Sequence, residues 1–514
     1  MADVVLGVDI GTTATKVAAF GSDGGVLADH AIGYPLEEPR PGEAVQDPDV
    51  ILRAVLDGVR EAAAGARAAG ARVAGLSFST AMHTLIGFDG AGRPLTPSIT
   101  WADTRAIAQA ERLRAAPGGL ELHRRTGTPV HPMAPLPKLV WFREEQPELF
   151  ARVRGWAGIK EHVLRHLTAE WVTDLSVASA TGLLDQAALD WDGEALELAG
   201  LERDRLPALV PSTHVLALVP AAADELGVPA DTPVVVGGAD GPLANLGVGA
   251  VRPGVGACSI GTSGALRVMV ERPGVDPQGR VFCYALTAER WTVGGAINNG
   301  GVVLQWAHDA LAPDLGAPAA VALLELAARV PAGSDGLLML PYLLSERAPH
   351  WSALPRGAYV GLTRAHRREH MVRAAVEGVC LQLALVLRSL REAGGEVREL
   401  RATGGFARSP FWRQLLTDAL GMEVGFPEAS EGSCLGAALL GMQALGMIES
   451  IDVAADLVHI DDVVEPDPGD AETYAAALPM FAGLYDALEP TFRALQRLGA
   501  HETPKPDPTR EDSS

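Results

Sequence analysis

Cysteine is scarce in this chain of 514 residues, which contains only Cys258, Cys283, Cys380 and Cys434. They lie far apart, without the close pairs that mark zinc or redox motifs, so we expect small buried hydrophobic residues. Positive charge is also in deficit: 42 Lys and Arg residues face 64 Asp and Glu residues, and the formal net charge is −22. Nucleic acid and anionic membranes are therefore not expected as partners, because both require a positive protein surface.

Long uninterrupted apolar segments are missing as well. The most apolar stretch, 371–390, contains Arg373, Glu377 and Arg388, and no run is long enough to cross a bilayer. The N-terminus enters a β-type segment with Asp3 ahead of it, which is not the pattern of a signal peptide. We therefore expect a cytoplasmic protein with no membrane partner. The 48% apolar composition is ample for large cores in two to four domains.

Lysine and asparagine are rare. Four of the 42 Lys and Arg residues are lysine, namely Lys16, Lys138, Lys160 and Lys505. Asparagine occurs only as Asn245, Asn298 and Asn299, all within Gly-rich segments. A lysine kept under such a bias is a candidate for a compact point charge that a planar guanidinium cannot replace. Chance is the alternative explanation for any single one of these residues.

One short phrase occurs twice, at Asp9–Thr13 and at Ser259–Gly264, and both copies contain Ile-Gly-Thr between β-type segments. A tight strand-turn-strand unit rich in Gly, Thr and Ser lets backbone N–H groups and hydroxyls approach an anion such as phosphate. Ordinary hairpin turns have a similar composition, and this is the alternative for either copy alone. Two copies at the starts of two halves favour a duplicated fold whose related lobes face one nucleotide.

The surrounding pattern is that of an α/β chain. Strands are predicted at 4–8, 14–20, 26–34, 73–79, 85–88, 234–236 and 400–403. Helices are predicted after the N-caps Asp47 and Ser409, each followed by Pro, and also at about 370–391 and from about Ser433. Residues 100–230 alternate helical patterns with Pro-rich loops, and residues 501–514 are polar and predicted to be disordered.

Two further stretches carry a specific resemblance. They are Met133–Phe142 and Gly357–Leu362, the latter followed by His370-Met371 and Ala374–Glu377. With the paired hairpins, they resemble the FGGY family of carbohydrate kinases, in the actin-like ATPase superfamily, over about residues 4–495. The resemblance implies an α/β fold of two duplicated actin-like, ribonuclease H-like lobes with a cleft between them. We expect an N-terminal lobe at 1–250, a C-terminal lobe at 251–500 and a tail at 501–514.

Within this family the sequence is most similar to gluconokinases. The similarity lies in Met82–Gly87, Thr96–Asp103, Gly127–Met133, Ala178–Gly182 and Asn298–Gly301. Xylulokinases would usually have Gln at position 81 and Gly at 84, where this chain has Ala81 and Thr84. The resemblance therefore implies ATP-dependent phosphorylation of D-gluconate to 6-phospho-D-gluconate. Other FGGY substrates, such as xylulose, glycerol or ribulose, stay open, as does an actin-like ATP-binding protein without kinase activity.

Asp240 is the predicted catalytic base, because it follows a buried strand between glycines and matches the family's base. A structural aspartate or a helix cap is the alternative. By the same resemblance, Asp9 and Asp240 are the candidate Mg²⁺ ligands, with Asp9 acting through waters. Lys16 is predicted to reach the β- or γ-phosphate, and a solvated strand residue is its alternative reading.

The remaining expectations concern ATP and a small sugar acid. The resemblance assigns the nucleotide to Gly11, Thr12, Thr13, Lys16, Gly261, Thr262, Ser263, Gly301, Gln305, Gly404, Gly405 and Ser409, with adenine near 428–435. It assigns the substrate to Met82, His83, Trp101, Asp103, Arg105, Met133, Lys138, Asp240 and Gly241. The cations available for a substrate carboxylate are His83, Arg105, Lys138 and Lys160. Glu346 and Arg347 are expected to form an internal ion pair, and a homodimer is an open alternative to a monomer.

Overall fold

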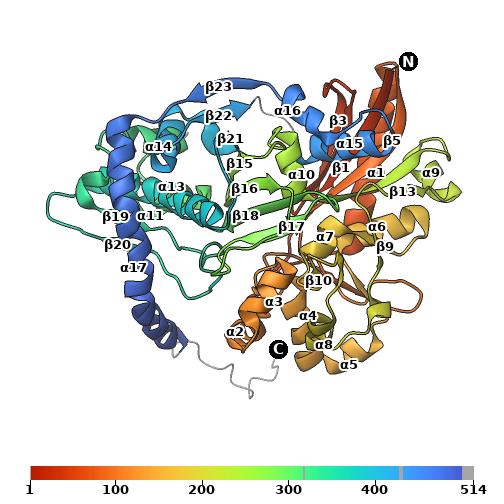
Figure 1. Cartoon of the computed structure of the whole chain (residues 1–514), viewed down its shortest axis with the longest axis horizontal. Coiled ribbons are helices and arrows are strands. Elements are labelled where there is room, and N and C mark those ends of the chain that lie inside the picture. Colours follow the sequence, from red (N-terminus) through yellow and green to blue (C-terminus); the bar gives the residue numbers. More distant parts are fainter. Residues whose placement is uncertain (1, 317–318, 428–431, 501–514) are drawn as a thin grey trace, which may run out of the picture.

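Two sheets organise the computed structural model, which describes residues 2–316, 319–427 and 432–500 (Figure 1). The first has the order β13-β14-β5-β1-β2-β3, with β1 Ala2–Ile10, β2 Ala14–Phe20, β3 Val26–Gly33, β5 Ala71–Thr80, β13 Val215–Ala217 and β14 Pro233–Ala239. The second has the order β17-β18-β16-β15-β21-β22-β23, with β15 Val255–Ile260, β16 Gly264–Val270, β17 Phe282–Ala285, β18 Trp291–Ile297, β21 Glu399–Thr403, β22 Val424–Pro427 and β23 Ile460–Val464.

The two sheets repeat one topology. In each, three antiparallel strands that are neighbours in the sheet (β1, β2, β3 and β15, β16, β18) are followed by two strands that join in parallel (β5, β14 and β21, β22). In the second sheet the edge strand β17 pairs with β18. The repeated phrase forms the first turn of each set, between β1 and β2 and between β15 and β16. The duplication predicted from the sequence is therefore confirmed, and both turns lie at the carboxyl end of the first strand of their sheet.

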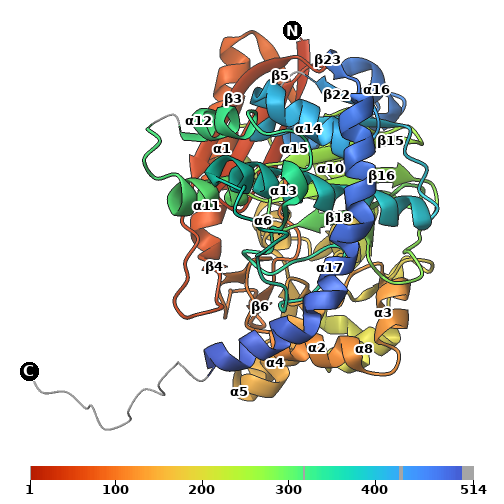
Figure 2. The same ribbon diagram turned by 90° about the vertical axis from the view of Figure 1, so that its left-hand side faces the viewer.

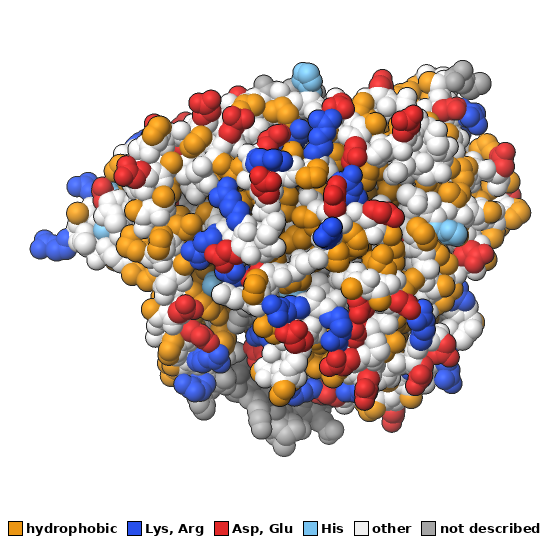
Figure 3. Space-filling view, viewed as in Figure 1, with side chains coloured by type: hydrophobic (Ala, Val, Ile, Leu, Met, Phe, Trp, Pro, Cys, Tyr) orange, Lys and Arg blue, Asp and Glu red, His pale blue; other side chains and the backbone are white. Residues whose placement is uncertain are grey.

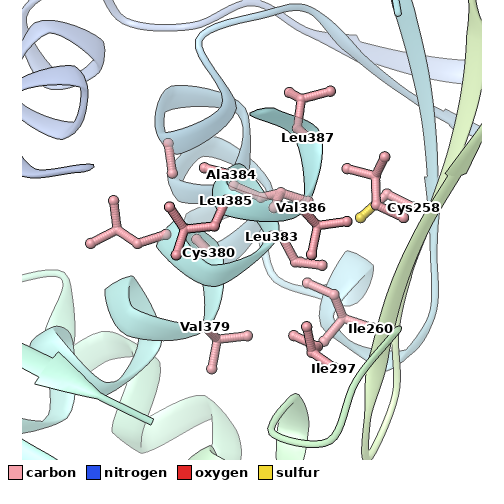
Figure 4. Packing of buried hydrophobic residues seen from close by; sticks show 14 of the residues in the cluster. Cys258, Ile260, Ile297, Val379, Cys380, Leu383, Ala384, Leu385, Val386 and Leu387 are labelled. Atoms are coloured by element: carbon pink, nitrogen blue, oxygen red, sulfur yellow. The ribbon is translucent and has the colours of Figure 1, made fainter. Parts of the chain in front are cut away.

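Helices α1 (Pro48–Ala68) and α13 (Arg368–Glu392) occupy equivalent places after the third strand of each set. Asp47 caps α1 by accepting hydrogen bonds from the N–H groups of Asp49 and Val50, as its sequence predicts. In α13, Val379, Leu383 and Val386 belong to the same core cluster as Cys258, Ile260 and Ile297 of the sheet (Figure 4). Helix α13 is long and apolar enough to cross a membrane, but 89% of its apolar window is buried inside the protein.

Helices α10 (Asp240–Gly247) and α15 (Gly432–Ala444) pack against one another where the two halves meet (Figure 1). Their backbones approach so closely that a Cβ on Gly436 would lie 2.0 Å from the Leu243 carbonyl oxygen. Helix α15 also packs on β1 and β5, where a Cβ on Gly7 would lie 2.0 Å from the Cys434 carbonyl oxygen. A helix from the second half of the chain thus covers one face of the first sheet.

A helical region is inserted between β5 and β14 and has its own apolar cluster. Its helices are α2 Ile107–Ala115, α3 Gly119–Thr126, α4 Pro135–Glu145, α5 Pro147–Arg152, α6 Ile159–Thr168, α7 Leu175–Ser179, α8 Gly193–Ala199 and α9 Pro220–Leu226. The remaining longer helices are α11 Gly301–Leu311, α12 Ala319–Ala327, α14 Pro410–Leu420 and α17 Pro468–Ala500. Helix α17, which the sequence pattern did not reveal, packs along α13 and α14 (Figure 2).

The surface and the cysteines agree with the composition. Acidic and basic side chains are interspersed on the face shown in Figure 3, without a broad basic patch. All four cysteines are buried, as predicted. The predicted disordered tail at 501–514, and residues 428–431 of the expected adenine region, lie outside the described residues.

Candidate active site

Two cavities meet at the second repeated turn. The larger has a volume of about 900 Å³ and the smaller about 290 Å³, and Gly261 lines both. The smaller cavity is lined from both halves of the chain, by residues such as Thr12, His83 and Asp240 from the first and Arg267 and Arg347 from the second. This arrangement allows two ligands to meet at one turn.

The larger cavity is built from the second half. Gly301 begins α11 and donates a 2.7 Å hydrogen bond from its N–H to the Gly261 carbonyl, so the helix start is fastened to the turn. Gly404 has φ +117°, and a Cβ there would lie 2.2 Å from the Ile260 carbonyl oxygen. Ser409 caps α14 through the Trp412 N–H. A helix N-terminus beside Gly-rich backbone suits phosphates.

Six of the residues predicted for the nucleotide line this cavity, together with apolar side chains that suit a flat base. The six are Gly261, Thr262, Gly301, Gln305, Gly405 and Ser409, and the apolar side chains include Leu304, Leu324 and Phe411. Of the other predicted residues, Thr12 and Ser263 line the smaller cavity, whereas Gly11, Thr13, Lys16 and Gly404 line neither.

The first repeated turn is held by hydrogen bonds to its neighbours. The Thr12 hydroxyl accepts a 2.9 Å hydrogen bond from the Trp101 indole N–H. The Tyr34 hydroxyl donates to the Gly11 carbonyl at 2.7 Å. Asp9, at the end of β1, accepts a 2.7 Å hydrogen bond from the Ser79 hydroxyl. Trp101 therefore contributes to the smaller cavity and also positions Thr12.

Asp240 stands at the junction of β14 and α10, and its carboxylate faces the smaller cavity. It accepts a 2.8 Å hydrogen bond from the Gly241 N–H. Burial raises the pKa of Asp240, and the nearby Arg267 guanidinium opposes that rise. Met82 packs beside it, because a Cβ on Gly241 would lie 2.8 Å from the Met82 Cε. The geometry gives the cavity one partly buried carboxyl group.

His83, one of the cations expected for a substrate carboxylate, is a buried residue that lines the smaller cavity. Burial, followed by the nearby Lys138 charge, lowers the pKa of His83 to about 3. Its Nδ1 lies 2.7 Å from the Ala180 carbonyl oxygen, which can only accept, so Nδ1 carries the proton. Its Nε2 is then an acceptor, suited to a sugar hydroxyl. His83 has φ +68°, a left-handed conformation imposed by this tight segment.

Lys138, which the family signature places on the substrate side, is not among the residues that line the smaller cavity. Its fully buried ammonium donates to the carbonyls of His83, Thr100 and Met133 at 3.0, 2.7 and 2.7 Å. Three donors meet three acceptors, so none is left for a ligand. Lys138 instead ties together three segments that border the cavity.

The other expected cations are also satisfied elsewhere. Arg105 forms a two-pronged ion pair with Asp103, at 2.8 and 2.7 Å, and neither residue lines the cavity. Lys160 is fully buried in an ion pair with Asp174. Arg105 and Asp103, predicted for the substrate, and Lys160, an available cation, are thus held by protein partners and line neither cavity.

Glu346 and Arg347 do not form the expected ion pair. Glu346 is fully buried and accepts hydrogen bonds from the Asn298 N–H at 2.6 Å and the Asn299 side-chain amide at 2.8 Å. Arg347 turns the other way, lines the smaller cavity and stacks on Trp101, with its guanidinium carbon 5.1 Å from the ring centre. Glu346 therefore binds the Asn298–Asn299 segment, whereas Arg347 forms part of the wall of the smaller cavity.

Arg267 and Tyr284 are cavity residues that sequence reasoning missed. Arg267 stands in β16 between Leu266 and Val268, which both belong to the main core cluster. Since successive strand residues face opposite sides, a single charged residue in such a run must point away from the core. A single arginine between two core residues, in the strand that follows the second repeated turn, is the sequence signal that could have identified Arg267.

Comparisons with known proteins agree with this geometry. The FGGY family of carbohydrate kinases matches with its N-terminal domain at residues 4–247 and its C-terminal domain at 256–445. A gluconokinase of Bacillus subtilis is 44% identical over 95% of this chain and 97% of its own length. A xylulose kinase of Escherichia coli is 31% identical over 94% of this chain and 99% of its own. The crystal structure of gluconate kinase from Lactobacillus acidophilus superimposes with a TM-score of 0.91 at 34% identity, covering 96% of this chain and 100% of that one.

The fold class and family implied by the sequence motifs are thereby confirmed. Three findings agree with this family: the repeated topology, the turn shared by the two cavities and the similarity over nearly the full length of the chain. The chain belongs to the FGGY family of carbohydrate kinases.

Proposed function

We propose that this protein transfers the γ-phosphate of ATP to the terminal hydroxyl of D-gluconate, giving 6-phospho-D-gluconate and ADP. The observation that carries the proposal is the pair of cavities sharing Gly261, with Asp240 in the wall of the smaller. The larger accommodates ATP, and its phosphates extend along the turn. The smaller accommodates the sugar acid. The gluconokinase and gluconate kinase relatives support this choice of substrate.

In the proposed reaction the Asp240 carboxylate orients the gluconate hydroxyl and accepts its proton. The hydroxyl oxygen forms a bond to the γ-phosphorus while the bond from that phosphorus to the β,γ-bridging oxygen breaks, and ADP leaves. Such phosphoryl transfer depends mainly on positioning and charge stabilisation. His83 Nε2 and the Tyr284 hydroxyl, which has no hydrogen-bond partner among the described residues, are placed to bind sugar hydroxyls.

The acidic residues present fit a magnesium ion that travels with ATP. No cluster of three or more potential metal-binding side chains occurs within 2–316, 319–427 and 432–500. Mg²⁺ does not need one, because it retains waters and uses one or two carboxylates with substrate phosphates. Asp9 and Asp240 would hold it, Asp9 through water. When bound, it would supply positive charge to the β- and γ-phosphates.

A panel of acceptors tests the proposal. ADP release is measured in a coupled assay with gluconate, xylulose, glycerol and ribulose, and the phosphorylated product is identified by NMR. We expect the highest kcat/KM with gluconate and phosphate on its terminal hydroxyl. A clear preference for xylulose would favour the function named for the 31% identical relative. We also propose a cytoplasmic location, because the phosphate donor is ATP. That the protein forms a homodimer stays a prediction.

A further inference from the structure

The smaller cavity contains an excess of partly buried positive charge. Its ionisable lining residues, apart from neutral His83 and Tyr284, are the acid Asp240 and the two arginines Arg267 and Arg347. Asp240 attracts both arginines, but no ion pair within 4.0 Å joins either of them to a carboxylate among the described residues. Two guanidinium charges beside a single carboxylate leave an excess of positive charge, which costs free energy away from bulk water, so an anionic ligand would stabilise the pair.

Arg267 projects from β16 toward the first half of the chain. A Cβ on Gly241, beside Asp240, would lie 3.3 Å from the Arg267 Nε. That Nε is buried and has no hydrogen-bond partner among the residues described. An arginine side chain stays charged in proteins even where burial lowers its pKa, as it does here. The donors of Arg267 are therefore directed into a cavity without a protein acceptor for the Nε.

Arg347 approaches the same cavity from the segment after β19 (Leu338–Leu340). One guanidinium nitrogen donates to the Ile297 carbonyl at 3.0 Å, and the plane stacks on Trp101. Its Nε is likewise buried without a partner in the part of the chain that the structure describes. Two rigid guanidinium forks with unused donors form a geometry that suits a carboxylate.

We propose that Arg267 and Arg347 together form the carboxylate-binding site of the substrate cavity and select sugar acids over neutral sugars. This inference rests on the proposed kinase function and names its specificity residues. A carboxylate bound by both arginines offsets their charge, whereas a neutral sugar leaves it uncompensated. The γ-phosphate of ATP is another anion that could approach them, and the experiment separates the two.

The test uses D-gluconamide, which has the same hydroxyls as gluconate but no charge. Arg267→Met and Arg347→Met are assayed with both acceptors, and the readout is the ratio of kcat/KM for gluconate to that for gluconamide. This ratio does not depend on the fraction of active enzyme. We expect it to fall about 10- to 100-fold in each variant, the range for losing hydrogen bonds to a charged group. Arg267→Lys and Arg347→Lys, which keep the charge, should lose less.

Arg401→Met is the matched control. Arg401 is another arginine of the second sheet, but it donates to the Val248 carbonyl and to Glu399, outside both cavities. Its ratio should equal that of the wild type. An unchanged ratio in the Arg267 and Arg347 variants would overturn the site, and an unchanged ratio with an equal loss for both acceptors would indicate phosphate binding or folding. A wild type that prefers neutral sugars in the acceptor panel would instead refute the proposed function itself.

Discussion

Asp240 is the side chain on which the proposed chemistry depends most directly. Replacing it in Asp240→Asn keeps the size of the side chain but removes the proton acceptor, so turnover should fall about 100-fold or more while ATP binding is retained. Because burial raises the pKa of Asp240, wild-type kcat/KM should decline on acidification at a pH above the usual range for aspartate. Steady-state rates across pH and ATP titration by calorimetry check both points. Near wild-type turnover in the variant would exclude the role.

Glu346 should make stability depend on pH. Burial raises its pKa to about 7, from an ordinary value of 4.5. Between these values the folded protein holds the proton more tightly than the unfolded chain, so the free energy of unfolding should fall as the pH rises through this window. In Glu346→Gln that contribution disappears, and urea unfolding at about pH 5 and pH 8 should show a smaller decline.

The control for this comparison is Glu396→Gln, since the Glu396 side chain is 69% exposed. It should show the same decline with pH as the wild type. If Glu346→Gln also matches the wild type, Glu346 does not retain its proton in the folded state near neutral pH.

The sequence pattern indicated Asp240, which lines the smaller cavity, but not the two arginines that line it as well. Asp240 could be found because a strand ending in glycines places it at a sheet edge. The motif that contains Lys138 could not show that three carbonyls surround its ammonium and that it stays outside the cavity lining. Arg267 and Arg347 come from the second half, and only folding brings them opposite Asp240. Which arginines keep a buried Nε without a hydrogen-bond partner among the described residues is a property of the packed structure.

The junction between the second repeated turn and α11 should control nucleotide affinity. A Cβ on Gly301 would lie 2.7 Å from the Gly261 carbonyl oxygen, which is closer than real Cβ contacts permit. Gly301→Ala should therefore push α11 away from the turn and weaken the hydrogen bond between the two residues. We expect the KM for ATP to rise about 10-fold, equivalent to about 1.4 kcal/mol, with a smaller change in the KM for gluconate.

A matched Gly-to-Ala control is available in α8. A methyl group added at Gly193 would meet no atom within 4 Å, and the residue lies outside both cavities. Gly193→Ala should leave both KM values unchanged. If Gly301→Ala behaves in the same way, the turn and α11 tolerate separation and do not jointly shape the nucleotide cavity.

Strands and capped helices followed from the sequence, whereas α17 did not. Asp47 and Ser409 carry local signals that specify a helix start, and both caps are formed. Helix α17 contains Pro479 and Pro490, each of which removes a helical hydrogen bond and normally ends a helix. Its buried side chains Tyr474, Phe481 and Phe492 belong to the main core cluster. Tertiary packing therefore sustains a helix that local rules would interrupt.

The sequence predicts the duplication because the same Ile-Gly-Thr turn occurs in both halves. It does not predict how the two halves contact one another. Helices α10 and α15 contact one another through glycines that belong to no recognisable sequence motif. Only the packed structure shows that Gly436 must lack a side chain so that the Leu243 backbone can approach it.

This contact predicts that Gly436→Ala destabilises the whole molecule. The added methyl group would meet backbone at 2.0 Å, so the two helices must separate, although alanine is the better helix former. We expect a loss of about 1–3 kcal/mol in the free energy of unfolding, typical of overpacking, measured by urea denaturation. Gly483→Ala in α17, where a Cβ meets nothing within 4 Å, should cause no loss. Equal stability of the two variants would mean that the packing of the two halves does not depend on this close approach.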